Sequence, residues 1–110
     1  MNYEAVFRAL ALGDIDREGH DWQELTQHID HLDHRSEAFA RLSALVALGA
    51  SEPSIAVAMD RVVSAGVTGD EVVAMLVALA PTVGTARLIE AAPAIGLGLG
   101  IDVDHLLEER

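Results

Sequence analysis

Apolar residues recur at helical spacing along most of this chain, and no segment shows the two-residue alternation of a half-buried strand. The first apolar stretch ends at Gly13, a residue type suited to the left-handed conformation that closes many helices. A short amphipathic helix is therefore predicted at the start of the sequence, with an apolar stripe of Tyr3, Val6, Phe7 and Leu10.

Residues 14–37 have a different character, because eight acidic residues occur there with only two arginines. Four apolar residues in this segment still follow helical spacing. The pattern predicts a solvated helix that docks by one face, with a stripe of Trp22, Leu25, Ile29 and Leu32.

Two further helices are predicted over residues 36–49 and 51–66, and each ends at a glycine. Ser51 is placed to cap the second helix, with Glu52 and Pro53 in its first turn. In the first turn the Glu52 carboxylate lies near the positive end of the helix dipole. Pro53 sacrifices no hydrogen bond there, because backbone amides of the first turn have no partner within the helix. The residues expected to face inward are Phe39, Leu42, Leu45 and Val46 in the first helix and Ile55, Met59, Val62 and Val63 in the second.

The clearest local signal is a capping box that starts at Thr68. The Thr68 hydroxyl is expected to accept a hydrogen bond from the backbone amide of Glu71, whose carboxylate reaches back to the Thr68 amide. The helix that follows, over residues 71–80, is apolar around its whole circumference and is predicted to be the central, most buried element. Pro81 is expected to end it.

The last part of the chain is predicted to hold a helix over residues 82–92, a kink or end at Pro93, and a short acidic helix over 102–110. The glycines at 96, 98 and 100 are expected to loosen the segment between them. They follow no predicted strand, and the carboxylate of Asp102 after them would repel phosphate. These glycines are therefore expected to interrupt or end helices and not to form a nucleotide-binding site.

These elements predict an all-α fold, a compact bundle of about six helices in a single domain, 1–110. Its parts are an acidic N-terminal helical segment (1–34), core helices (35–92), and a C-terminal kink with a short helix (93–110). Hydrophobic residues make up 51% of the chain and aromatic residues only 4%, so aliphatic side chains must fill the interior. That favours closely packed helices over a sandwich and suggests further burial between subunits.

Charge and missing residue types exclude several function classes. The formal net charge is −11 and every basic residue is an arginine, so binding to nucleic acid is not expected. The chain contains no lysine to form a Schiff base. It also contains no cysteine, which excludes thiol peroxidase, disulfide exchange and thiolate metal chemistry.

Neither a targeting segment nor a membrane span is predicted. Residues 1–12 lack the pattern of a signal peptide, because Glu4 and Arg8 interrupt the apolar run. The longest apolar run, residues 72–81, is about half the length that crosses a bilayer. We therefore expect a cytoplasmic protein with no membrane contact.

Four pieces of the sequence occur in a characteristic order: Arg-Leu-Ser-Ala-Leu-Val-Ala-Leu-Gly at 41–49, Ser-Ala-Gly-Val-Thr at 64–68, Asp-Glu-Val at 70–72 and Val-Gly-Thr-Ala-Arg at 83–87. Together they resemble the carboxymuconolactone decarboxylase and alkyl hydroperoxidase D family over residues 32–89. The resemblance implies a helical hairpin of two long helices, in trimers or hexamers that bury apolar helix faces between subunits.

The resemblance also shows what this chain lacks. Redox members of the family open the first long helix with Cys-x-x-Cys, and a histidine follows four residues after the second cysteine. Lactone-decarboxylating members lack the cysteine pair but keep the histidine. The matching positions here are Ser51, Ser54 and Ala58. The family's glutamate on the preceding helix falls at Ala38 or Phe39, and Glu37 is adjacent but on a different face. The chain thus resembles a divergent member without the known catalytic residues, for which we expect no cofactor and no metal.

Candidate pocket residues are two hydroxyls and two guanidinium groups: Ser51, Ser54, Arg61 and Arg87. No histidine lies at helical spacing to activate either serine, so capping, the role given to Ser51, and a place on the helix face are the favoured roles. An arginine near an apolar cleft can hold a carboxylate with two parallel hydrogen bonds. Ion pairing between subunits, with Asp60, Asp70 or Glu90, is the favoured alternative for Arg41, Arg61 and Arg87.

Three histidines, His28, His31 and His34, are spaced three residues apart within the acidic segment. Their side chains would spread over about a third of a helix circumference, whereas a metal is bound better by residues four apart. They are interpreted as titratable residues on a solvated helix, with zinc or nickel binding as the alternative.

Three functions remain open. The first is a homo-oligomer that binds, or acts without cysteine on, a small carboxylated compound. The second is a non-catalytic structural or assembly subunit. The third is a lyase or hydrolase of the lactone decarboxylase type, with an arginine holding the acid group. Binding or catalysis requires a closed pocket with converging polar groups near Ser54, Arg61 or Arg87, whereas the assembly hypothesis predicts a filled interior and these arginines in ion pairs.

Overall fold

Helices account for all the regular structure within the part of the chain that the computed structural model describes, residues 2–13, 25–101 and 108. The prediction of an all-α fold is confirmed over those residues. The chain divides into two units, Met1–Asp33 and His34–Arg110.

In the first unit, helix α1 spans Tyr3–Leu12. The Asn2 side chain caps it by accepting a hydrogen bond from the Ala5 amide at 2.9 Å. Gly13 closes it with φ 65°, as its sequence position predicts. Tyr3 and Phe7 are 77% and 70% exposed, so the apolar stripe of α1 lies on the surface of its unit.

The solvated helix predicted over residues 14–37 is observed only in part. Residues 14–24, including Trp22, lie outside the described residues. Gln27–His31 forms a short 3₁₀ helix, η1, and a new helix begins at His34, so no single α-helix continues through this segment. Leu25 is buried while Leu32 is half exposed. The predicted stripe does not hold, because a 3₁₀ helix places residues on different faces from an α-helix.

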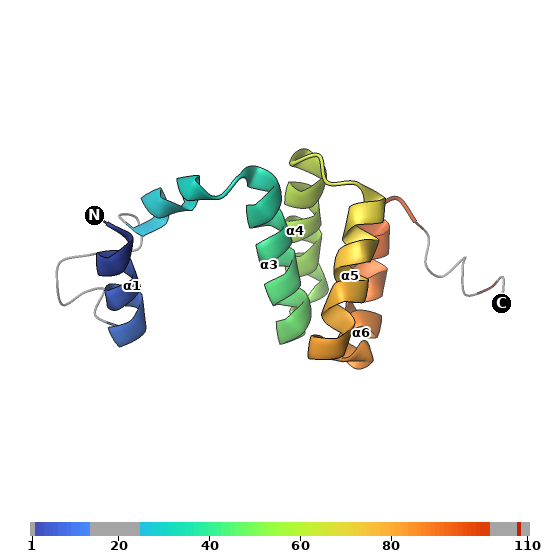
Figure 1. Ribbon diagram of the computed structural model, residues 1–110. Coiled ribbons are helices and arrows are strands. Elements are labelled where there is room, and N and C mark those ends of the chain that lie inside the picture. Colours follow the sequence, from blue (N-terminus) through green and yellow to red (C-terminus); the bar gives the residue numbers. More distant parts are fainter. Residues whose placement is uncertain (1, 14–24, 102–107, 109–110) are drawn as a thin grey trace. The chain divides into compact units, whose positions relative to one another are not determined.

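The second unit is a bundle of four helices that run alternately up and down (Figure 1). They are α3 (His34–Leu48), α4 (Glu52–Ser64), α5 (Gly69–Val83) and α6 (Thr85–Gly98). Helix α4 packs against α3 and α6, and α5 contacts α3 and α6. Short turns through Gly49, Gly66 and Gly84, each at positive φ, join successive helices. The first two of these ends were predicted from the sequence.

The core of this bundle is aliphatic, with one methionine at its centre. Leu42, Val46, Met59, Val62 and Val72 are fully buried. The inward positions predicted in α3 and α4 are therefore largely confirmed, including Ile55. Val63, predicted to face inward, is 55% exposed, because it lies one helical step of about 100° beyond the buried Val62.

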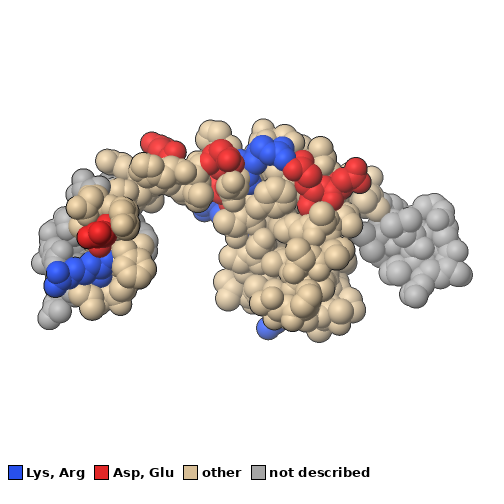
Figure 2. All heavy atoms as spheres, viewed as in Figure 1, with Lys and Arg blue, Asp and Glu red and all other residues tan. Residues whose placement is uncertain are grey.

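Helix α5 is not the most buried element, contrary to the prediction from its apolar circumference. Val72 is its one buried residue, while Val73 and Val77 are 52% and 68% exposed. In this bundle α5 packs by one stripe, and its opposite face is left uncovered by the described residues of the unit. Figure 2 shows the result: over α3 and α5 the surface lacks charge except near the ends of the bundle.

The helix end predicted at Pro81 is wrong, and of the kink or end predicted at Pro93 the end is not observed. Helix α5 continues through Pro81 to Val83, and α6 continues through Pro93 to Gly98. A proline removes one backbone hydrogen bond, and packing along the rest of each helix outweighs that loss. Gly96 is buried and Gly98 belongs to the helix, so these glycines do not loosen the segment. The acidic helix predicted over 102–110 lies outside the described residues, apart from residue 108.

None of the helices formed by the described residues is long and apolar enough to cross a membrane.

Candidate functional site

A capping cluster joins the starts of α3 and α5. Thr68 and Glu71 form the predicted capping box, with the Glu71 amide donating to the Thr68 hydroxyl at 3.2 Å and the Thr68 amide donating to the Glu71 carboxylate at 3.1 Å. Arg35 on α3 donates to the Gly66 carbonyl at 2.7 Å and pairs with the Glu71 carboxylate. These contacts tie α3 to the turn between α4 and α5.

The pKa of Glu71 is lowered within this cluster. The hydrogen bond from the Thr68 backbone amide is the largest cause, and partial desolvation opposes it. The Thr68 hydroxyl and the Arg35 guanidinium lower the pKa further. The contacts of Arg35 join α3 to the turn before α5, and those between Thr68 and Glu71 cap α5, so the cluster stabilises the fold.

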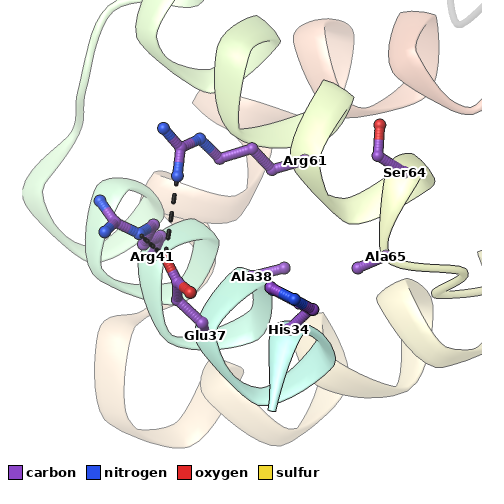
Figure 3. A pocket seen from close by; sticks show the side chains of 7 residues that line it. All are labelled: His34, Glu37, Ala38, Arg41, Arg61, Ser64 and Ala65. Atoms are coloured by element: carbon purple, nitrogen blue, oxygen red, sulfur yellow. Dashed lines mark hydrogen bonds and ion pairs between the residues drawn. The ribbon is translucent and has the colours of Figure 1, made fainter. Parts of the chain in front are cut away.

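A pocket of about 380 Å³ opens to solvent between α3 and the C-terminal half of α4. Figure 3 shows the Arg61 side chain reaching from α4 towards Glu37 and Arg41 on α3, while the Ser64 hydroxyl points away from Glu37. The residues that line the pocket are His34, Glu37, Ala38, Arg41, Arg61, Ser64 and Ala65.

Two guanidinium groups share one carboxylate in this pocket. Arg41 Nε donates to Glu37 Oε1 at 2.9 Å, and Arg61 Nη1 lies 3.7 Å from the same oxygen. The Glu37 side chain is 20% exposed, whereas those of Arg41 and Arg61 are 48% and 57% exposed. Among the described residues neither arginine has another acceptor. The pocket lining thus carries one more positive than negative charge, in a chain whose formal net charge is −11.

Of the four candidate pocket residues named from the sequence, only Arg61 lines this pocket. Ser51 and Ser54 lie at the other end of α4, with their hydroxyl oxygens 3.1 Å apart. Ser51 occupies the N-cap position, but its side chain makes no capping hydrogen bond, so its predicted capping contact is wrong. Arg87 on α6 pairs with Glu90 at 3.3 Å.

The sequence analysis missed the role of Glu37 and the presence of His34 in the pocket. Glu37 and Arg41 are four residues apart on α3, a spacing that predicts an ion pair on its own. The arrival of Arg61 from α4 depends on the crossing of two helices, and no sequence spacing indicates it. Ala38, one of the positions that the resemblance gives to a glutamate, also lines the pocket.

The remaining chemical groups do not converge. The rings of His28 and His31 have centroids 5.9 Å apart in η1, while His34 begins α3 in the other unit. No group of three or more metal-ligating side chains is found in the described ranges. Ala58, at the position of the family's histidine, is buried in the core of the bundle.

A second open pocket, of about 1070 Å³, lies between α4 and α6. Its lining is mostly apolar, with Pro93, Ala94 and Leu97 from α6 and the carboxylates of Glu52 and Asp60 at its rim. It brings together no nucleophile with a base, and no sequence-predicted site residue lines it.

The criteria that separate binding from assembly are each met in part. Arg35, Arg41, Arg61 and Arg87 all make ion pairs, as the assembly hypothesis predicts. The polar groups of the α3–α4 pocket converge beside Arg61, as binding requires, but the pocket is open to solvent and not closed as the binding hypothesis predicts. One carboxylate there faces two guanidinium groups.

Comparison of the chain with models of known protein families, with curated proteins and with solved structures finds no match in any of the three. The case for a function therefore rests on the geometry of the pocket and of the bundle surface.

Proposed function

We propose that this chain is a cytoplasmic, homo-oligomeric protein of the carboxymuconolactone decarboxylase-like type that lacks the family's redox site and binds a small carboxylated compound between α3 and α4. The observation that carries the proposal is the sharing of the Glu37 carboxylate by Arg41 and Arg61.

The chemistry of the pocket suits a carboxylate. A guanidinium group holds its donors in a planar fork that matches the two oxygens of a carboxylate. Arg41 gives its Nε–H to Glu37 and leaves its terminal N–H groups without an acceptor among the described residues. The pocket volume of about 380 Å³ lies in the lower part of the range typical of small-molecule sites, which suits a compound of few heavy atoms.

The test is binding of butyrate, as a simple monocarboxylate, measured by isothermal titration calorimetry at low salt. Arg61→Gln is expected to weaken butyrate binding about tenfold or more, because a charge-assisted hydrogen bond contributes about 1.5–3 kcal/mol. Arg87→Gln is the matched control, since it removes the same charge from a residue outside the pocket and should leave butyrate affinity unchanged. Equal affinities for the two variants would contradict the proposal.

A second candidate function, assembly, is favoured by the uncharged surface of α5. This helix carries no charged residue after Glu71, and Val73 and Val77 are more than half exposed. An apolar helix normally buries its whole circumference. A second copy of the chain is the occupant that we propose, because two copies can approach through this face without bringing acidic residues together.

Val77→Asp tests this assembly directly, with molar mass measured by light scattering. The substitution would place a carboxylate inside the proposed interface, so the variant is expected to be monomeric while the unaltered chain is a trimer or hexamer. Val57→Asp on α4, where the side chain is 60% exposed, is the matched control and should leave the molar mass unchanged. A monomeric unaltered chain would contradict the proposal.

A further inference from the structure

Glu37 occupies an unusual position for a residue in an anion-binding pocket, because it supplies a negative charge where a ligand would bring one. We infer that Glu37 is a resident counter-ion that makes the pocket select singly charged carboxylates over doubly charged ones. This inference rests on the proposed carboxylate binding and adds the charge of the ligand to it.

The first support is the formal charge of the lining. Arg41 and Arg61 contribute two positive charges and Glu37 one negative charge, so one ligand carboxylate makes the occupied pocket neutral. A dicarboxylate would leave an excess negative charge in a chain that already carries a formal net charge of −11. Like charges at close range oppose binding.

The second support is that Glu37 is held in place. Its side chain is 20% exposed and accepts a 2.9 Å hydrogen bond from Arg41 Nε, within one turn of the same helix. A ligand carboxylate is therefore added beside Glu37 and does not displace it. Arg61 lies 3.7 Å from the Glu37 oxygen, beyond hydrogen-bonding distance, so its donors remain available to a second acceptor.

The other ion pairs of the bundle give a contrast. Arg35 pairs with Glu71 and Arg87 pairs with Glu90, one cation to one carboxylate in each case. Only around Glu37, among the described residues, do two arginines meet a single carboxylate.

The test compares butyrate with succinate, which has the same number of carbon atoms and one more carboxylate, by calorimetry on Glu37→Gln. The amide oxygen of glutamine still accepts the Arg41 hydrogen bond, so the pocket geometry is kept while one negative charge is removed. With the second succinate carboxylate roughly 9 Å from residue 37 and an effective dielectric constant of about 40–80, the ratio of succinate to butyrate affinity should rise about two- to fivefold.

A control variant isolates the pocket charge. Glu90→Gln changes the net charge of the chain equally but lies outside the pocket, so its affinity ratio should equal that of the unaltered chain. If butyrate binds and Arg61→Gln weakens it, yet Glu37→Gln leaves the ratio unchanged, the selectivity inference is overturned and the proposed function stands. If butyrate binds to no variant, both are overturned.

Discussion

A single methyl group added to Gly98 tests how closely α6 packs on α4. A Cβ atom at this position would lie 2.7 Å from Met59 Cβ and 3.0 Å from Met59 Cγ. Met59 is fully buried in α4, and its Cβ is fixed to the backbone. Rotation of the methionine side chain cannot relieve the closest contact, so Gly98→Ala must shift one helix relative to the other.

Two opposing effects set the magnitude. Alanine is favoured over glycine within a helix by about 0.5–1 kcal/mol, and by less at the last helical residue, which Gly98 is. Overpacking of a close contact costs about 1–3 kcal/mol. The steric cost is the larger, and Gly98→Ala should lower the free energy of unfolding by about 1–2 kcal/mol. A loss of 1 kcal/mol lowers Tm by about 4–8 °C in a domain of this size.

The assay is thermal and urea unfolding followed by circular dichroism at one fixed protein concentration, because an oligomer melts at a concentration-dependent temperature. Gly69→Ala is the matched control, since its added Cβ would meet nothing closer than Leu99 Cδ2 at 4.0 Å. The control should be neutral or slightly stabilising. A Gly98→Ala variant as stable as the Gly69→Ala variant would refute the close packing of α6 on α4.

Three further predictions concern the bundle. Leu42→Ala, at a fully buried position, should cost about 2–5 kcal/mol in urea unfolding, and a loss below 1 kcal/mol would contradict its place in the core. Thr68→Ala should cost about 0.5–2 kcal/mol through loss of the N-cap, with no comparable loss for Thr85→Ala, which caps nothing. The pKa of Glu71 is lowered on folding, so its ionised form contributes stability above its ordinary pKa of 4.5. That stability is lost as the pH falls through the lowered pKa, and the difference in Tm between the unaltered chain and Glu71→Gln should therefore shrink on acidification. A difference that is constant with pH would contradict this sign.

The sequence by itself determined the local features of this protein. The capping box at Thr68, the left-handed glycine at Gly13 and the helix ends at Gly49 and Gly66 were all predicted correctly. Each depends on residues within four positions of one another, which short-range sterics and hydrogen bonds control. The inward positions Leu42, Val46 and Met59 followed from helical periodicity for the same reason.

Only the tertiary structure decided which apolar surfaces are buried and which charges meet. The apolar circumference of α5 predicted burial, yet burial depends on how many neighbours surround a helix, and Val77 is 68% exposed. Pro81 predicted a helix end and Pro93 a kink or an end, but both helices continue through their prolines, because packing along the whole helix outweighs one lost hydrogen bond. The pocket itself requires Arg61 on α4 to reach Glu37 on α3, a contact between residues 24 positions apart that no local pattern encodes.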